Sequence, residues 1–461
     1  MNRPDFPKYP EIKNLVGPPF VRYGKVNFRI NPRHLAARCI HDARLHVFDG
    51  GIWVCWKDDG WKKLSENDVL NDLEDLISQS GTDYDVLGKM QVSESELREA
   101  LQIVKRKAYS GPMPQVDPDI IPVSNGVLRW VDAKQNFEFV DYTPEIMVFD
   151  RMPISYDPAA TAPQFEAVLQ EILPDPEDRR VAQEYLGAAL FFENRTRKFL
   201  LCLGEGGCGK TILSLFLIAI IGKDRTMELK MSNVKNPYEF SSLTTQTLLT
   251  APEAVSRALC TDGAEYVKKL VGGDFFQTQQ KFRNARVDHY GTFTLLVMSN
   301  HQLRFQYEGR GDEWRDRVIP IFFDRHIPEE RRELGLVDRL LREEGPGIFD
   351  WFLEGARRVR QNNWRITLSP IQRDRTKRLL ALSNPMMVFV QNHIKLSAGR
   401  NILSSQAWEK YLDIREQVGL PVLESAAFYK QLAKAMGEIY HAAVTNTING
   451  KNRGYRGFEL V

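Results

Sequence analysis

The segment Gly204-Glu-Gly-Gly-Cys-Gly-Lys-Thr211 constrains the fold of this chain more than any other feature of its sequence. It has the spacing Gly-x4-Gly-Lys-Thr and lies between an apolar, strand-like run (198–203) and an apolar, helix-like run (211–221). Glycines in such a loop let backbone N–H groups curl around phosphate oxygens, and the helix that follows adds a favourable dipole. The motif predicts a parallel α/β core that binds a nucleoside triphosphate. Its candidate ligands are Gly204, Glu205, Gly206, Gly207, Cys208, Gly209, Lys210 and Thr211.

Two residues of this loop have distinct expected roles. Lys210 is expected to reach the β- and γ-phosphates, and the Thr211 hydroxyl to bind Mg²⁺, so ATP and Mg²⁺ are the expected cofactors. The histidines and the five cysteines show no His-x3-His, HExxH or Cys-x-x-Cys spacing. We therefore expect no metal site made of side chains alone, and we expect free thiols in a reducing cytoplasm.

Polar residues follow two apolar strands C-terminal to the loop. Glu253 follows the run 247–252 and is expected to orient or activate the attacking water. Asn300 follows the run 292–299, where its amide could hold the water or the γ-phosphate. The alternatives are a surface glutamate and a turn-forming asparagine.

Two arginines, Arg315 and Arg317, precede the apolar run 318–323. Because a guanidinium is always charged and delocalised, an arginine here suits a finger that reaches the γ-phosphate of a neighbouring subunit. Arg317 is the first candidate and Arg315 the second. The alternative is a surface ion pair with one of the nearby acidic residues.

The distribution of turns, linkers and periodic segments predicts five parts. The signals are tight turns at Gly50-Gly51 and Asn125-Gly126, a helix cap at Ser93, and a linker rich in proline and small residues from Tyr156 to Pro163. The expected parts are an α/β N-terminal domain (1–155), a helical collar (156–195), the core (196–328), a helical connector (329–383) and a small C-terminal domain (384–461).

The C-terminal domain has the outline of a winged helix. Helical periodicity covers 386–393, 405–418 and 425–437, and two short strands, 442–447 and 455–461, are expected to form a terminal hairpin around a polar turn. The turn would form a wing with the basic residues Lys451, Arg453 and Arg456. A winged helix that binds protein, with a solvated wing, is the alternative.

The order of these motifs resembles that of superfamily 3 helicases, specifically the D5-like group with poxvirus D5 and the C-terminal part of phage P4 primase. The loop, the Glu253 strand, the segment Lys268-x3-Gly-Gly-Asp274, the Asn300 strand and the Arg317 strand occur in the family order. Segments outside the core are also similar to this group: 125–128, 154–159, 184–187 and 455–460.

This resemblance implies an AAA+-type P-loop ATPase core between an α/β N-terminal domain and a C-terminal winged helix. It implies a ring, usually a hexamer, that hydrolyses ATP between subunits and translocates on single-stranded DNA, typically 3′ to 5′. Arg317 would then act on the nucleotide of the next subunit. The implied role is replication of a phage, plasmid or mobile element, with single-stranded and forked DNA and a primase or origin-binding protein as partners.

In superfamily 3 rings, the position of residues 275–290 is a β-hairpin that points into the channel. Basic side chains there would follow phosphates without reading sequence, and an aromatic ring could stack on a base. The net charge of only +2 means that such local patches, rather than the whole chain, must attract DNA. The candidates are Lys268, Lys281, Phe282, Arg283 and Arg286; an ordinary charged loop is the alternative.

Other functions remain open at this stage. One is a P-loop ATPase switch or motor that does not separate strands. Another is a DNA-binding initiator with a relic ATPase, but this would show a damaged loop or a missing acid, and the sequence has neither. The longest nearly apolar run, Ile212–Ile221, is shorter than the about 18 residues of a membrane span, so no membrane association is expected.

Overall fold

The structure, a computed structural model, describes most of the chain from residue 16 onward. The described part is 16–461 without 24, 26, 58–59, 84–89, 113–116, 232–239, 241–242, 244, 256–258, 260–262, 280–285, 302, 304, 306–311, 384, 419–422, 442–443, 446 and 449–451. It forms two compact units. The first extends to Val131 and includes Phe137–Met152, and the second comprises Asp132–Asn136 and Pro153–Val461. Within the described residues, no helix has the length and apolar character needed to cross a membrane.

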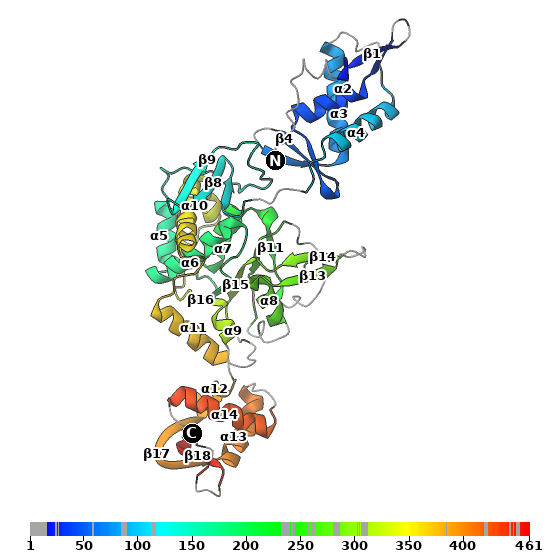
Figure 1. The fold of residues 1–461 in the computed structure, drawn as a ribbon. Helices are drawn as coiled ribbons and strands as arrows, with labels where there is room; N and C mark the ends of the chain where they lie inside the picture. The colour runs from blue at the N-terminus through cyan, green and yellow to red at the C-terminus, as the bar shows by residue number, and fades with distance from the viewer. Residues whose placement is uncertain are drawn as a thin grey trace. The chain divides into compact units, whose positions relative to one another are not determined.

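Among its described residues, the first unit contains three small sheets and three helices, several of which are labelled in Figure 1. The helices are α2 (Pro32–Asp42), α3 (Glu66–Asp83) and α4 (Glu94–Lys107). One sheet joins β1 (Phe20–Tyr23), β2 (Asn27–Ile30) and β6 (Met90–Gln91); the second joins β3 (His46–Phe48), β4 (Ile52–Lys57) and β5 (Gly60–Leu64); the third joins β7 (Ile120–Val123), β8 (Gly126–Val131) and β9 (Asn136–Val140).

Three local predictions are confirmed in this unit. The Gly50-Gly51 turn lies between the paired strands β3 and β4, and the Asn125-Gly126 turn joins the paired strands β7 and β8. Ser93 caps α4: its hydroxyl accepts from the Glu96 N–H at 3.3 Å, and the Glu96 carboxylate accepts from the Ser93 N–H at 3.0 Å.

The second unit is built around a five-stranded sheet, as the alternating strand and helix signals predict. Its strands are parallel, in the order β11-β12-β15-β10-β16. They are β10 (Phe199–Leu203), β11 (Thr226–Glu228), β12 (Leu248–Ala251), β15 (Thr294–Ser299) and β16 (Val318–Phe322). Leu203 pairs with Ser299 on one side and Phe322 on the other, so the carboxyl ends of these three strands lie together at one edge.

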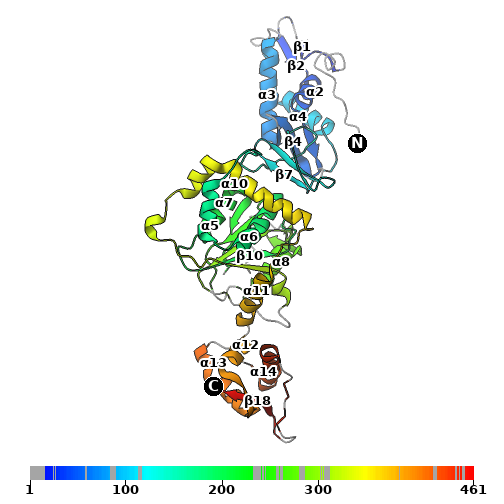
Figure 2. The ribbon, with the colours of Figure 1, turned by 90° about the vertical axis from the view of Figure 1, so that its left-hand side faces the viewer.

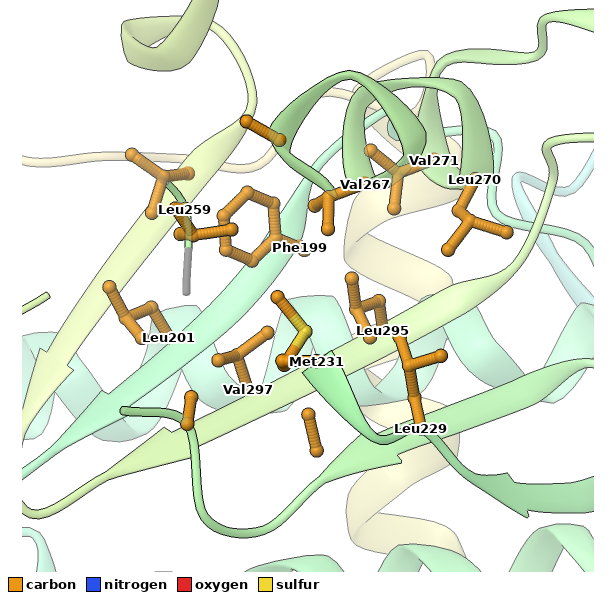
Figure 3. Close-up of a cluster of buried hydrophobic side chains, with 14 of the residues drawn as sticks. Phe199, Leu201, Leu229, Met231, Leu259, Val267, Leu270, Val271, Leu295 and Val297 are labelled. Carbon is orange, nitrogen blue, oxygen red and sulfur yellow. The ribbon is translucent and has the colours of Figure 1, made fainter. Parts of the chain in front are cut away.

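Both faces of this sheet are covered by helices, which explains why β10, β12, β15 and β16 are buried and mostly apolar. Figure 3 shows one face, where Phe199 and Leu201 of β10 and the side chains of β15 meet Val267, Leu270 and Val271 of α8 (Gly263–Gly272). On the other face, α7 (Lys210–Ile221) contacts β12 and β15. Outside α7 lie α5 (Pro163–Ile172), α6 (Pro176–Ala188) and the long α10 (Leu336–Gln361) (Figure 2).

The remaining elements of the core are short. An antiparallel pair, β13 (Phe275–Gln279) and β14 (Arg286–Tyr290), follows α8, and α9 (Asp312–Arg315) precedes β16. Helix α11 (Pro370–Ser383) contacts β16 and α9. The Arg375 guanidinium ties α11 to α6 through the buried carboxylate of Asp178, at 2.7 Å.

The crossing of α6 and α10 depends on two glycines. A Cβ atom at Gly187 would lie 2.3 Å from the backbone nitrogen of Ala356, and one at Gly355 would lie 1.9 Å from the carbonyl oxygen of Gln183. The two backbones therefore touch where these residues meet.

We expect Gly355→Ala to lower the thermal unfolding midpoint of the second unit. An extra methyl in a packed interior costs about 1–3 kcal/mol, which exceeds the roughly 1 kcal/mol that alanine gains over glycine inside a helix. Gly345→Ala is the matched control in the same helix, because its Cβ would meet only the terminal methyl of Ile154, at 3.1 Å. Calorimetry that shows equal midpoints for both variants would contradict this account.

The C-terminal part contains α12 (Pro385–His393), β17 (Ile394–Leu403), α13 (Ser404–Val418), α14 (Ser425–Tyr440) and β18 (Gly454–Leu460). The three predicted helices are confirmed. Within the described residues, β18 pairs with β17, a strand that the sequence does not predict, from Ile394↔Leu460 to Leu403↔Gly454. Within the described residues, the predicted hairpin retains only the bridge Thr447↔Arg453. The sequence hides β17 because most of its side chains are exposed, and only Ile394 and Ile402 enter the core.

Candidate active site

The glycine loop joins the carboxyl end of β10 to the first turn of α7, as its flanks predict. Its backbone needs glycine at the point where it leaves the sheet. Gly204 has φ +157°, and a Cβ there would lie 2.3 Å from the carbonyl oxygen of Phe323, just beyond β16. The loop therefore presses against the end of the neighbouring strand, and only a residue without a side chain fits.

Lys210 is held inside the loop by three hydrogen bonds. Its ammonium donates to the carbonyl oxygens of Gly204 (2.6 Å) and Glu205 (2.7 Å) and to the side-chain oxygen of Asn300 (3.0 Å). The side chain is buried, and this burial lowers the pKa of the ammonium. Two residues predicted from separate segments, Lys210 and Asn300, thus lie in direct contact.

Asn300 and Glu253 lie at the same edge of the sheet. The backbone N–H of Ala254 donates to the carbonyl oxygen of Met298 at 2.9 Å, and the Ser299 hydroxyl donates to that of Ala254 at 2.7 Å. These bonds fix the turn after β12 against the end of β15. Glu253 is exposed there, and its carboxylate has no hydrogen bond or ion pair within the described residues.

A cavity of about 460 Å³ opens beside the loop. This volume is within the range of small-molecule pockets. The loop and Asn300 form one wall, and α11 forms another with Arg375 and Arg378. The turn after β16 adds Asp324 and His326. Sequence reasoning missed these two walls, since α11 follows the motif by more than 150 residues and its basic residues resemble a solvated face.

Thr211 is exposed in the first turn of α7. In the part of the chain that the structure describes, no cluster of three or more His, Cys, Asp or Glu side chains could hold a metal ion. Cys39, Cys55, Cys202 and Cys208 are buried free thiols, and Cys260 lies outside the described residues.

Arg317 lies at the opposite edge of the sheet from the loop. It directly precedes Val318, which pairs with Phe199 at the amino end of β10, whereas Phe322 pairs with Leu203 beside the loop. Four residues of strand separate these ends, about 13 Å. The structure therefore does not bring Arg317 and Lys210 together within one subunit.

The Arg317 side chain is half-buried and partly unsatisfied. One terminal nitrogen donates to the carbonyl oxygen of Glu313 at 3.2 Å, and its Nε is buried without a partner. Within the described residues it makes no hydrogen bond or ion pair to a carboxylate. Arg315, the second candidate, is exposed at the end of α9.

At the position where a hairpin is expected, β13 and β14 form an antiparallel pair, with Gln279 opposite Arg286. Phe275 and Tyr290 face each other at its base with ring centroids 5.7 Å apart, and both are exposed. Lys281, Phe282 and Arg283 lie outside the described residues.

The other DNA-binding candidates differ in their surroundings. Lys268 lies on α8, where its ammonium forms an ion pair with Glu313 at 2.6 Å, so its charge is already partnered. In the C-terminal part, Arg453 and Arg456 are exposed, and Lys451 lies outside the described residues.

Comparison with known proteins identifies one segment of the chain. Residues 33–174 match the family model described as D5 N terminal like. We call these residues the D5-like segment, after the family that they resemble. It spans the three sheets of the first unit except for β1 and β2, and it continues through α5 of the second.

Solved structures resemble the chain over most of its length. The apo structure of the NrS-1 C terminal region (305-718) is 13% identical, with a TM-score of 0.51, over 92% of this chain and 99% of that one. The A form apo structure of the same NrS-1 region is 12% identical, with a TM-score of 0.50, over 92% and 98%. At these identities the likeness concerns the fold alone.

Proposed function

We propose that this protein is an ATP-dependent DNA helicase of superfamily 3 that acts in the replication of a phage, plasmid or mobile element. The observation that carries the proposal is the intact glycine loop with Lys210 in contact with Asn300, combined with Arg317 at the opposite edge of the same sheet. The glycine loop would bind the phosphates, and Arg317 of a neighbouring subunit would supply the cation that completes the site.

The strand order supports an AAA+-type core, because the strand before the loop lies inside the sheet between β15 and β16. The D5-like segment directly before this core supports a replication role. The order α12-β17-α13-α14-β18 and the bridge before β18 support a winged helix.

In the proposed mechanism each polar residue has one task. Lys210 would leave the loop carbonyls and neutralise the β- and γ-phosphates, Asn300 would hold the attacking water or the γ-phosphate, and Glu253 would orient that water. The exposed Thr211 hydroxyl fits a Mg²⁺ that arrives with the nucleotide, and Mg²⁺ neutralises charge on the phosphates when bound. Arg317 would stabilise the transition-state charge on the nucleotide of the adjacent subunit.

DNA contact is proposed at the β13–β14 hairpin. The positive charge of Arg286 suits phosphates, and the exposed rings of Phe275 and Tyr290 would stack on bases. The exposed Arg453 and Arg456 suit phosphates of a duplex at the C-terminal domain.

The decisive experiment measures ATP hydrolysis with and without single-stranded DNA, together with unwinding of duplexes that carry a 3′ or a 5′ tail. We expect DNA to stimulate hydrolysis and only the 3′-tailed duplex to be unwound. Lys210→Ala is the inactive control. Hydrolysis that is indifferent to DNA, with no unwinding of either duplex, would instead support a P-loop switch or motor and a protein-binding C-terminal domain.

A further inference from the structure

The turn after β16 folds back onto the glycine loop. The backbone N–H of Ile327 donates to the carbonyl oxygen of Gly207 at 3.1 Å. Arg332 lies next to this contact: its Nε donates to the carbonyl oxygen of Ile327 at 2.9 Å, and one terminal nitrogen donates to Nε2 of His326 at 3.2 Å. A guanidinium is thereby fixed over the loop by neighbours on its own turn.

The contact with the loop is close. A Cβ atom built on Gly207 would lie 2.3 Å from that terminal nitrogen of Arg332 and 3.2 Å from Cε1 of His326. The guanidinium therefore occupies the space that a side chain at Gly207 would fill. Gly207 has φ +81°, a backbone conformation that favours glycine.

Arg332 differs from Arg331 and Arg339 in having no acidic partner within the described residues. Arg331 pairs with Glu171 at 3.0 Å, and Arg339 pairs with Glu333 at 2.6 Å. Within the described residues, Arg332 makes no ion pair, and it is exposed. An unneutralised guanidinium held against a phosphate-binding loop has the planar donor geometry that phosphate oxygens prefer.

We propose that Arg332 is a second phosphate-binding residue of the nucleotide site, contributed by the same subunit as the loop. It would bind the phosphate chain of the nucleoside triphosphate from the side of Gly207, while Lys210 binds it from inside the loop. His326 is the positioning residue, because its Nε2 lies 3.2 Å from a terminal nitrogen of Arg332. This assignment deepens the proposed function and rests on its nucleotide site.

The test uses isothermal titration of the full-length protein with ATP and, separately, with inorganic tripolyphosphate. We expect Arg332→Ala to weaken both affinities by about tenfold or more, the size of a lost charge-assisted hydrogen bond. Arg332→Lys should recover part of the loss. Arg331→Ala is the matched control, since it removes the same charge one position away, and it should bind both ligands as the wild type does.

The role of His326 is tested in the same titrations. His326→Ala should weaken ATP binding less than Arg332→Ala does, and it should add nothing in the Arg332→Ala background, because it acts only through that guanidinium. An additive loss in the double variant would show that His326 does not position Arg332.

Each outcome separates this inference from the helicase proposal. Unchanged affinities in Arg332→Ala, or an equal loss in Arg331→Ala, overturn the inference while leaving the loop and its ATPase role intact. A loss for ATP without a loss for tripolyphosphate also overturns it, since Arg332 would then contact the base or ribose. Wild-type protein that binds ATP but unwinds no DNA would refute the helicase alone, and failure to bind ATP at all would refute both.

Discussion

Arg317→Ala is expected to lower the rate of ATP hydrolysis by about a thousandfold, the lower end of what arginine fingers contribute. ATP affinity should stay close to that of the wild type, because Arg317 lies at the opposite edge of the sheet from the loop of its own subunit. Steady-state hydrolysis and equilibrium binding of ATP, measured on the same preparation, check both parts.

Mixing two inactive variants tests whether Arg317 acts on the nucleotide of its own subunit or on that of the adjacent subunit. Lys210→Ala has an intact finger and a damaged loop, and Arg317→Ala has the reverse. If the finger acts between subunits, a mixture of the two forms some interfaces with both parts intact and regains activity. No activity in the mixture, after conditions that exchange subunits, would mean that Arg317 acts within its own chain.

Arg315→Ala is the matched control, as a second arginine two positions away that is exposed at the end of α9. It should retain most of the hydrolysis. If Arg315→Ala loses most of its ATP hydrolysis and Arg317→Ala loses little, then Arg315 is the arginine finger and Arg317 is not. Unfolding midpoints are needed for Arg317→Ala, because its Nε is buried and its guanidinium binds the Glu313 carbonyl.

Lys210→Ala is expected to reduce hydrolysis by at least about a hundredfold and to weaken ATP binding, since it removes the cation that we propose binds the phosphates. It also leaves two loop carbonyls and the Asn300 oxygen without their partner. Loop rearrangement is therefore part of the loss. Single-turnover rates and ATP titration separate the effect on chemistry from the effect on binding.

The control for this variant is Lys223→Ala, which removes an exposed lysine just beyond the other end of α7. It should hydrolyse ATP like the wild type. Hydrolysis that survives in Lys210→Ala would mean that the loop does not bind the reacting phosphates, and it would end the ATPase proposal.

Sequence alone predicted the centre of the candidate site because its parts are local. The loop is one contiguous motif, and Asn300 follows a strand whose carboxyl end must lie beside that of β10 in a parallel sheet. The Lys210–Asn300 contact follows from these two facts. The same logic predicted the edge on which Glu253 lies, and the exposure of Glu253 agrees with the alternative of a surface glutamate.

The parts of the site and the fold that the sequence did not predict depend on contacts that leave no periodic pattern of apolar residues in the sequence. Arg332 and His326 reach the loop through an irregular turn, and Arg378 reaches the cavity from a helix whose charges resemble a solvated face. Lys268 looked available to DNA, yet it pairs with Glu313, 45 positions away. The partner of β18 was missed because β17 buries so few of its side chains.

The glycine loop and Arg317, the proposed finger, lie at opposite edges of one sheet, and this has a consequence for the number of complete active sites. Each subunit would contribute its glycine loop to one active site and its Arg317 to the next. An isolated subunit would then complete no active site. A linear oligomer would always leave the glycine loop of one terminal subunit without an arginine finger. Such a head-to-tail contact is heterologous, and only a closed cycle gives every loop a donor. The rate of ATP turnover per subunit would therefore report the fraction of subunits that are in closed rings. Dilution of the protein would lower this rate before it changes the affinity for nucleotide.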